Sequence, residues 1–382
     1  MRIALVLSTP LPACEGIGFY VWNLGRFLTH HGHEVHIITR GEPTKPAYEQ
    51  VQAIHIWRPA FWRIYPFHVD MHGYFVTQTL ETIANTYGLD LIHVHTPLVK
   101  IPKSAYPVVV TVHTPMKTDT AAIPLRSVFD MLIKLQTPFS IRLEKRLFRQ
   151  ATTITTVATS VASELGAYGL QPHQVAVVGN GVDTATFYPP VDLQARFHQR
   201  YFLTVGRLAP RKGLEDLIAS AAEVVKRYPT YRFFIVGQGP LAAVLQKQIT
   251  QLHLDQHVQL LGHMADREQL ADLYRGAWAY IHPAHYEGLP TALLEAMACG
   301  CPVVATAVSG ALDVITPHNG VLVNPHAPVQ LTQAVCRFIE QPQVARDLGQ
   351  QAALTIQQQY GWTAIGQRYL ATYHHAIQGA TA

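Results

Sequence analysis

Three cationic side chains stand in one short loop of the chain, where they could hold an anion. The loop Gly206–Gly213 contains Arg207, Arg211 and Lys212, and it follows the apolar run Tyr201–Val205, which is typical of a buried strand. Arginine offers a bidentate fork to a phosphate group, and lysine offers a point charge. The loop therefore favours a diphosphate ligand, with a merely solvated loop as the alternative.

Two glutamates with seven residues between them flank the start of a predicted helix. Pro290 and Thr291 indicate where that helix begins, so Glu287 precedes it and Glu295 lies in its second turn. Glu295 falls within an apolar stripe, which is an unfavourable place for a charge. Hydroxyl groups bound by a carboxylate near the positive helix end would explain it. Two surface glutamates are the alternative.

A glycine pair, Gly16 and Gly18, follows the first apolar run and opens a predicted helix at Phe19–His31. Unshielded backbone N–H groups at a helix start suit a phosphate, although a tight turn is an equal alternative. The pair is not part of a G-x-G-x-x-G motif, and no acidic residue ends the second predicted strand. A dinucleotide-dependent dehydrogenase is therefore disfavoured.

Histidine is abundant, with 21 residues, and this invites a metal interpretation. His93 and His95 alternate on one predicted strand, and His113 ends the next, so three imidazoles could hold zinc. Histidines at strand ends that bond to loops and substrate are the better interpretation. We therefore expect no metal site.

The elements that must position these residues are strands and helices in alternation, which is typical of doubly wound parallel sheets. Ligands of such sheets bind at the carboxyl ends of the strands, so two of them would face each other across a cleft. The expected strands are Ile3–Leu7, Val35–Thr39, Leu91–Val94, Val108–Val112, Ile154–Val157, Tyr201–Val205, Arg232–Val236, Val258–Leu261, Ala279–His282, Pro302–Thr306 and Val321–Val323.

The chain of 382 residues is long enough for two such domains. An Asn-Gly turn at residues 180–181 and a Pro-Pro pair at 189–190 indicate a break. We expect a first domain over residues 1–188 and a second domain over residues 189–361. A last helix is expected to begin at Trp362.

Composition excludes several classes of protein. Hydrophobic residues make up 48% and charged residues 14%, so the chain is not disordered, and a net charge of +4 is too small for a typical nucleic-acid-binding protein. The four cysteines contain no C-x-x-C pair. No apolar run of about 18 residues exists, so we expect a cytoplasmic protein, with peripheral contact at the inner membrane face left open.

The glutamate pair formed by Glu287 and Glu295 resembles the signature of the retaining GT-B glycosyltransferases of family 4. The resemblance covers essentially the whole chain, and it implies an acceptor-side domain over residues 1–188, a nucleotide-sugar-binding domain over 189–361 and a C-terminal helix, residues 362–382, that packs back on the first domain. Seven further motifs carry it in order: Gly16–Val35, Asp90–His95, Thr111–His113, Asn180–Asp183 with Phe187, Val236–Pro240, Gly300–Ala305 and Gly320–Val323.

The resemblance implies a role for each matching residue. Arg207 and Lys212 would hold the donor diphosphate and stabilise its departure, Glu287 would face the donor sugar, and His113 would lie near the anomeric centre. These four are the expected catalytic residues. The remaining expected donor-binding positions are Gly16, whose backbone would contact the phosphates, Glu295, which would bind the ribose, and Gly288 and Leu289.

The resemblance further implies transfer of a sugar from a nucleotide-sugar donor to an acceptor hydroxyl, with retained configuration. No D-x-D sequence occurs, so we expect no cofactor and no metal requirement. A nucleotide-sugar epimerase on the same scaffold is the alternative, and a relative without activity is a third reading. The chain departs from the family at Ala284, often a serine, and at Asp313, which would fill an acidic role usually taken by glutamate.

The sequence does not identify the acceptor, and a glycolipid, a polysaccharide or a small-molecule glycoside would each fit. Residues 117–149 carry seven basic and three acidic side chains among apolar ones, and Ile56–Phe75 is rich in aromatic residues. A basic amphipathic surface would suit anionic lipid. Ordinary helix packing with a solvated face is the alternative, and we favour it slightly.

Overall fold

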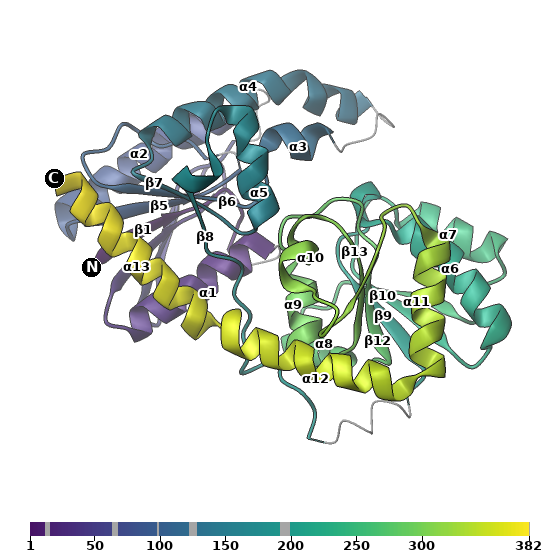
Figure 1. The fold of residues 1–382 in the computed structure, drawn as a ribbon. Helices are drawn as coiled ribbons and strands as arrows, with labels where there is room; N and C mark the ends of the chain where they lie inside the picture. Colours follow the sequence, from purple (N-terminus) through teal and green to yellow (C-terminus); the bar gives the residue numbers. More distant parts are fainter. Residues whose placement is uncertain (12–15, 63–67, 98, 122–127, 192–198, 382) are drawn as a thin grey trace. The chain divides into compact units, whose positions relative to one another are not determined.

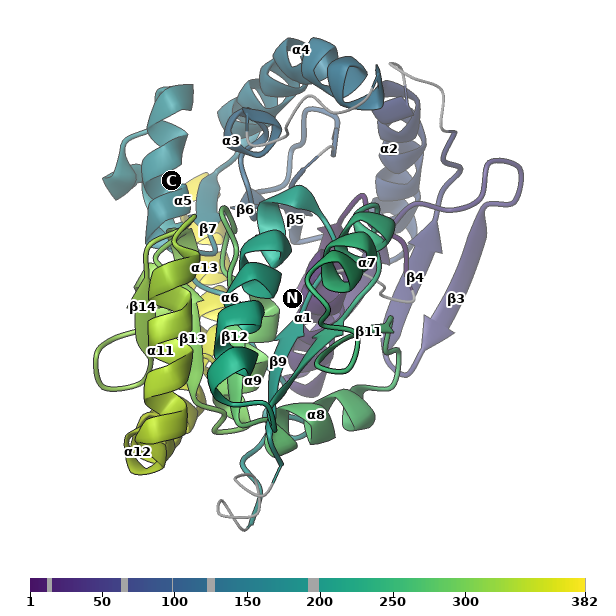
Figure 2. The same cartoon turned by 90° about the vertical axis from the view of Figure 1, so that its right-hand side faces the viewer.

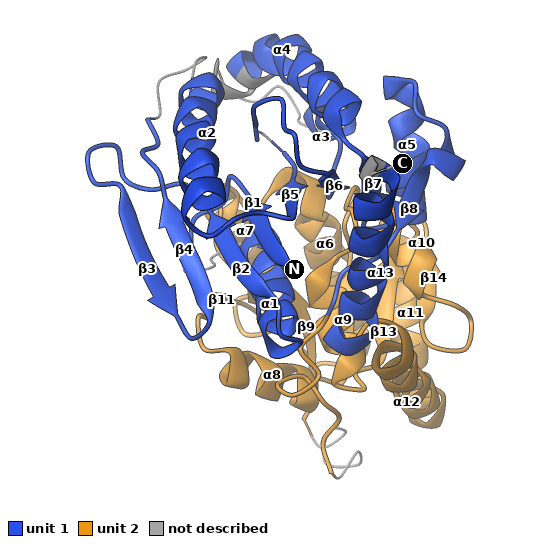
Figure 3. Ribbon diagram, turned by 90° about the vertical axis from the view of Figure 1, so that its left-hand side faces the viewer, with its two compact units in different colours: residues 1–181, 362–382 blue, residues 182–361 orange. Residues whose placement is uncertain are grey.

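The computed structural model describes residues 1–11, 16–62, 68–97, 99–121, 128–191 and 199–381. The chain forms two compact units, which are described separately (Figure 3). Unit 1 comprises Met1–Gly181 and Trp362–Ala382, and unit 2 comprises Val182–Gly361. In the described part of the chain, no helix is both long enough and apolar enough to cross a membrane.

Unit 1 contains an eight-stranded sheet in the order β3-β4-β2-β1-β5-β6-β7-β8, parallel except for the antiparallel edge pair β3–β4. The apolar residues of β1 are fully buried, as expected for a strand in a sheet that helices cover on both faces. The strands are Arg2–Val6 (β1), Glu34–Ile38 (β2), Ala47–Val51 (β3), Ile54–Arg58 (β4), Leu91–His95 (β5), Val108–Val112 (β6), Thr153–Thr156 (β7) and Val175–Val177 (β8).

Helices cover both faces of this sheet (Figure 1). α1 and α13 lie on one face, and α2 and α4 lie on the other. Gly366 lets α13 approach α1, because a Cβ there would overlap the ring of Phe27. The helices are Gly16–His30 (α1), His68–Thr86 (α2), Met116–Ala121 (α3), Val128–Gln150 (α4), Thr159–Glu164 (α5) and Trp362–Thr381 (α13).

Unit 2 contains a six-stranded parallel sheet in the order β11-β10-β9-β12-β13-β14. The chain runs outward from β9 in one direction and then outward from β12 in the other, so the strand order reverses between β9 and β12. Ligands of such sheets bind at this reversal, outside the carboxyl ends of the strands. The strands are Tyr201–Val205 (β9), Arg232–Val236 (β10), Val258–Gly262 (β11), Ala279–His282 (β12), Val303–Thr306 (β13) and Val321–Val323 (β14).

The helices of unit 2 also form two layers (Figures 1 and 2). α6, α7 and α11 cover one face of the sheet, and α8, α9, α10 and α12 cover the other. They are Leu214–Arg227 (α6), Ala242–Gln251 (α7), Arg267–Gly276 (α8), Thr291–Ala298 (α9), Ser309–Val314 (α10), Pro328–Glu340 (α11) and Pro342–Gln359 (α12). The expected α/β class, with two doubly wound parallel sheets, is confirmed.

The chain passes between the units at residues 181–182 and 361–362, so the first boundary lies seven residues before the one expected at residue 188. Val182 belongs to unit 2 because its N–H donates to the carbonyl oxygen of Tyr360 at 2.8 Å. Phe187 is fully buried and packs against Tyr274. The Asn-Gly turn therefore lies nearer the boundary than the Pro-Pro pair does.

Candidate active site

The cationic loop lies at the strand reversal of unit 2, between β9 and α6. Its last residues, Pro210–Lys212, form a 3-10 turn, and Gly213 follows with a positive φ of 62°. A Cβ at Gly213 would also overlap the carbonyl oxygen of Pro283, so only glycine fits. This close approach joins the cationic loop to the loop that follows β12, where Glu287 lies.

Lys212 and Glu287 form an ion pair between these two loops. Both side chains are mostly buried, with exposed fractions of 17% and 16%. Burial alone would raise the pKa of Glu287, but the charges of Lys212 and Arg211 outweigh it and hold that pKa below its usual value. A buried carboxylate is thus kept ionised beside an ammonium group at the point where ligands of this sheet class bind.

Glu295 lies in the middle of α9 and is buried. One of its oxygens accepts a hydrogen bond from Arg267 at 2.8 Å, and the other accepts one from the Tyr274 hydroxyl at 3.2 Å. Burial raises the pKa of Glu295, and the bonds to Arg267 and Tyr274 oppose that rise. The protein itself therefore supplies partners for both oxygens of this carboxylate.

Gly288 and Leu289 are buried between Glu287 and the start of α9. The carbonyl oxygen of Gly288 accepts a hydrogen bond from the N–H of Gly310 at 2.8 Å. A Cβ on Gly310 would overlap that oxygen and the Cα of Leu289. α10 thus packs tightly against the Glu287 loop and fixes its backbone.

His113 follows β6 in unit 1 and lies in a buried histidine group. Its Nε2 is 3.3 Å from Nδ1 of His95, and its ring lies at right angles to that of Tyr20, with centroids 5.0 Å apart. Burial lowers the pKa of His113 to about 3 and that of His95 well below its usual value. His113 is therefore a neutral imidazole at physiological pH, able to donate or accept one hydrogen bond at each nitrogen.

His93 has both ring nitrogens occupied by hydroxyl groups. Its Nδ1 is 2.7 Å from the hydroxyl of Tyr373, and its Nε2 is 2.7 Å from that of Thr111. Tyr369 bonds to Thr111 at 2.9 Å and to the Tyr20 hydroxyl at 2.6 Å. This arrangement leaves His93 no free nitrogen for zinc and ties the strand ends to α13.

The other two expected phosphate-binding residues are exposed. Arg207 lies near the start of the cationic loop, two residues beyond the end of β9. Gly16 is the first residue of α1 in unit 1, directly after residues 12–15, which lie outside the described residues. Within unit 2, the structure therefore brings together Lys212 and Glu287, while Glu295 has its own partners and His113 and Gly16 belong to unit 1.

Sequence reasoning missed Arg267 and Tyr274 as partners of Glu295. Both come from α8, whose N-cap Asp266 accepts hydrogen bonds from the N–H groups of the next turn. A buried carboxylate requires a cation or hydroxyl partner, so the burial expected for Glu295 was a signal that such partners exist. No local pattern identifies these partners, because Tyr274 and Arg267 lie 21 and 28 positions before Glu295, respectively.

The two segments considered for an acceptor have different surroundings in unit 1. Trp57 and Phe75 line a cavity of about 300 Å³ between β4 and α2. Tyr65 and Phe67 lie outside the described residues. On α4, Leu135 is 78% exposed and Phe139 is 46% exposed, which is unusual for helix residues that only pack inward.

Comparison with known families finds two that together span most of the chain. Residues 15–186 match the model described as Glycosyltransferase Family 4, and residues 192–355 match the one described as Glycosyl transferases group 1. The two matches correspond closely to unit 1 and unit 2.

Characterised relatives align over nearly full length. The chain is 27% identical to an MMP alpha-(1->4)-mannosyltransferase of Mycolicibacterium hassiacum, with 100% of both chains covered. It is 26% identical to a phosphatidyl-myo-inositol mannosyltransferase of Propionibacterium freudenreichii, over 99% of this chain and 96% of the relative.

Solved structures share the fold. A sucrose-phosphate synthase from Thermosynechococcus elongatus superposes with a TM-score of 0.82 at 24% identity, covering 99% of both chains. Anabaena HepE in complex with UDP-glucose gives 0.74 at 17% identity, over 98% of this chain and 100% of that one. At these identities the likeness concerns the fold, which is GT-B.

Proposed function

Since this chain belongs to the glycosyl transferases group 1 and glycosyltransferase family 4, and is a sugar-transferring enzyme, we propose that it moves a sugar from a nucleotide-sugar donor to an acceptor hydroxyl with retained anomeric configuration. The observation that carries the proposal is the Lys212–Glu287 ion pair at the strand reversal of unit 2. An ammonium group and an ionised carboxylate there suit a diphosphate and sugar hydroxyls, respectively.

In this proposal, Lys212 and Arg207 neutralise the diphosphate as it leaves, so positively charged side chains replace a divalent ion. Glu287 binds hydroxyls of the donor sugar, Gly288 and Leu289 contribute backbone groups beside it, and Glu295 binds the ribose. Neutral His113 bonds to the donor sugar, and Gly16 offers its N–H to the phosphates. Anabaena HepE, which has the same fold, binds UDP-glucose, which supports a nucleotide sugar as the donor class.

We further propose that the acceptor is carried at an anionic membrane surface. The exposed surface of α4 includes Met131, Leu132, Leu135, Phe139, Arg142 and Arg146. Leu135, Phe139, Arg142 and Arg146 follow one another at helical spacing, so apolar and cationic groups share one exposed stripe. Such a stripe binds by burying apolar side chains among lipids while its cations meet anionic headgroups.

The exposure of Leu135 on this stripe makes lipid docking a stronger explanation than ordinary packing, which the sequence alone had slightly favoured. One relative is named for a phosphatidyl-myo-inositol acceptor, which supports a lipid acceptor as a class. Under this proposal the protein is cytoplasmic and peripheral on the inner membrane face.

A panel of UDP-, GDP- and ADP-sugars, each with the purified protein and extracted membrane lipids, tests the function. We expect one donor to release its nucleoside diphosphate and to label a lipid or sugar acceptor, with turnover that does not depend on added Mg²⁺ or Mn²⁺. Turnover that requires added Mg²⁺ or Mn²⁺ would contradict metal independence at the diphosphate.

The same panel separates the epimerase alternative, which the relatives named above do not support. An epimerase would change the sugar while the nucleotide stays attached, whereas transfer releases the nucleoside diphosphate. A chain without activity would bind a nucleotide and do neither. NMR of the labelled product then fixes the anomeric configuration, and an inverted linkage would contradict a retaining enzyme.

A further inference from the structure

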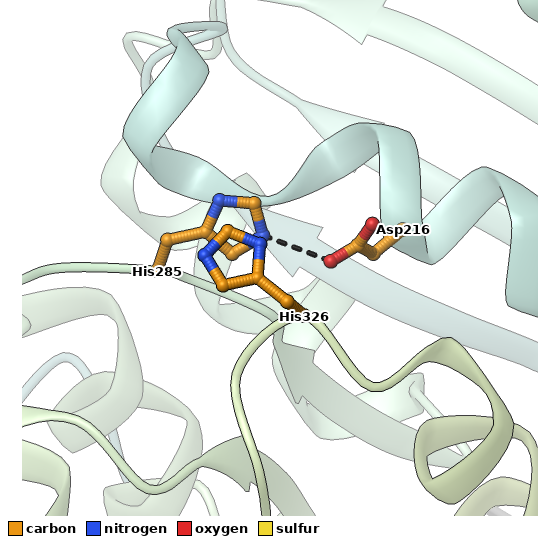
Figure 4. A group of neighbouring side chains, drawn as sticks. All are labelled: Asp216, His285 and His326. Atoms are coloured by element: carbon orange, nitrogen blue, oxygen red, sulfur yellow. Dashed lines mark hydrogen bonds and ion pairs between the residues drawn. The ribbon is translucent and has the colours of Figure 1, made fainter. Parts of the chain in front are cut away.

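Two imidazole rings and one carboxylate meet in unit 2, close to the cationic loop (Figure 4). Of all the residues that the structure describes, Asp216, His285 and His326 form the one group of three His, Cys, Asp or Glu side chains whose ligand atoms lie within 4.8 Å of one another. Neither the donor site nor the histidine group of unit 1 accounts for them.

The three side chains come from three separate elements. Asp216 lies in the first turn of α6, His285 follows β12, and His326 lies in the loop between β14 and α11. Nε2 of His285 is 2.8 Å from Oδ2 of Asp216. The rings of His285 and His326 have their centroids 3.6 Å apart and their planes tilted by 34°, and Asp216 faces their edge (Figure 4).

We propose that Asp216, His285 and His326 bind one divalent transition-metal ion of the zinc class. Imidazole nitrogen and carboxylate oxygen are ligands that zinc takes, and three protein ligands with a water in the fourth position form a known open zinc site. Magnesium and calcium prefer sites made of oxygen ligands, so two imidazoles disfavour them.

The present geometry is close to what such an ion needs. Zinc holds nitrogen and oxygen ligands at about 2.0–2.2 Å, so the ligand atoms of a tetrahedral site lie about 3.3 Å apart. Nε2 of His285 and Oδ2 of Asp216 are now 2.8 Å apart, so they need to separate by only about 0.5 Å to admit the ion. His326 is exposed on a loop, so its ring can turn away from that of His285 to complete the set.

Binding exchanges protons for the metal. On His285 the ion binds Nε2, and the neutral ring in the bound state carries its single proton on Nδ1. A proton on Nε2 before binding passes to solvent from a protonated ring, or moves through solvent to Nδ1 in a neutral one. His326 binds as a neutral imidazole and Asp216 as a carboxylate, so any proton these groups carry is released to solvent. No electron transfer is involved, and the site needs no other reactant.

A metal here would clamp the loops that carry Lys212 and Glu287. The N–H of His285 donates to the carbonyl oxygen of Arg211 at 2.8 Å, and Arg211 precedes Lys212. His285 itself stands two residues before Glu287. The ion would therefore hold the Glu287 loop, the start of α6 and the β14–α11 loop together. The inference does not depend on the proposed function, because it rests on these three side chains alone.

The test uses the untagged full-length protein, stripped with EDTA and titrated with Co²⁺, whose visible absorption reports coordination by nitrogen and oxygen. The main variant is His326→Gln, which removes an exposed ligand and should not disturb folding. The matched control is His318→Gln, another exposed histidine in a turn of unit 2. Asp216→Asn removes the charged ligand and keeps the side-chain volume.

We expect wild type and His318→Gln to bind one Co²⁺ per chain and to unfold at a higher temperature when Zn²⁺ is present. Loss of one ligand should weaken Co²⁺ binding about 100-fold in His326→Gln and Asp216→Asn, and it should abolish the Zn²⁺ effect on unfolding. Equal affinity in wild type and His326→Gln would overturn the site. An equal loss in His318→Gln, or no tight binding by wild type, would overturn it too.

Discussion

The ammonium group of Lys212 and the carboxylate of Glu287 form an ion pair across 75 positions of sequence. The pair joins the cationic loop after β9 to the loop after β12, the two neighbours at the strand reversal. A diphosphate that binds Lys212 must share this cation with Glu287 or take it over. The protein thus holds Lys212 in place through a carboxylate of its own.

Lys212→Ala should impair both stability and ligand binding. It leaves the mostly buried carboxylate of Glu287 without its partner, so we expect a loss of about 2–3 kcal/mol in the free energy of unfolding. It also removes a contact worth roughly 1.5–3 kcal/mol, so nucleoside-diphosphate affinity should fall about 10- to 100-fold. Urea unfolding and calorimetric titration measure the two effects.

Arg207→Ala is the matched comparison, because Arg207 is exposed. It should weaken nucleoside-diphosphate binding by a similar factor and leave the free energy of unfolding unchanged. The double variant Lys212→Met, Glu287→Gln should recover most of the lost stability and none of the binding. Wild-type affinity in both single variants would show that these cations do not hold the diphosphate.

Glu295→Gln should separate ligand binding from stability. The pKa of Glu295 is raised by burial, so the folded state binds its proton more readily than the unfolded state, and the ionised carboxylate destabilises the fold at neutral pH. Gln removes that charge, and Arg267 is 31% exposed and can reach water. We expect a change in stability within about 1 kcal/mol and a loss of roughly tenfold in nucleoside-diphosphate affinity.

The control is Glu268→Gln, which removes an exposed carboxylate from neighbouring α8 and should change neither quantity. Thermal unfolding and calorimetry are again the measurements. A strongly destabilised Glu295→Gln with intact nucleotide affinity would assign Glu295 to the structural pair with Arg267 alone.

Stability should fall when the pH is lowered from 7 to 5. Burial lowers the pKa of His93 and of His113 from 6.5 to about 3, and that of His282 to about 4. Below pH 6.5 the unfolded chain binds protons at these rings while the folded chain does not. Each such histidine lowers the free energy of unfolding by about 1.4 kcal/mol per pH unit. Urea unfolding at several pH values gives the slope, and an unchanged free energy over this range would contradict the prediction.

Local pattern was enough to predict the strands that carry the site. Tyr201–Val205 and Ala279–His282 were expected with the bounds that β9 and β12 have, because both are short, apolar and bordered by loop residues. The edge hairpin of Ala47–Val51 and Ile54–Arg58 was missed. The side chains of the first of these strands are mostly exposed, so it lacks the apolar run that marked the others.

Side-chain pairing could not be predicted in the same way. The Glu295 bonds to Arg267 and Tyr274 depend on how α8 and α9 pack, and the approach of His326 to His285 depends on two loops from separate strands. Such contacts are set by strand order and loop conformation, which no spacing in the sequence encodes. The residue types of the site could be predicted from the sequence, whereas their hydrogen-bond and ion-pair partners could not.

Leu135→Glu should release the protein from anionic vesicles. In flotation with vesicles of phosphatidylcholine and phosphatidylglycerol, wild type should float at low salt and float less as salt screens the headgroups. The variant places a negative charge in the exposed stripe of α4, so it should stay at the bottom of the gradient. Leu354→Glu, which changes an exposed leucine on α12, is the control and should float like wild type. Equal flotation of the two variants would show that α4 does not bind the membrane surface.

His113→Ala should lower kcat far more than it weakens nucleotide binding. The side chains proposed to hold the nucleoside diphosphate, Arg207, Lys212 and Glu295, belong to unit 2, whereas His113 belongs to unit 1. Loss of a hydrogen bond to the reacting sugar should reduce kcat about 100-fold, and nucleoside-diphosphate affinity should change by less than about threefold. The control is His173→Ala, which changes an exposed histidine of the same unit and should match wild type in both quantities.

The pH dependence of kcat should have the same shape in His113→Ala as in wild type. Burial keeps His113 neutral down to a pH of about 3, so its loss should lower kcat by the same factor at every pH between 6 and 8. A variant that keeps its kcat and loses nucleotide affinity would place His113 in nucleotide binding, and a shifted pH profile would identify it as a titrating acid or base.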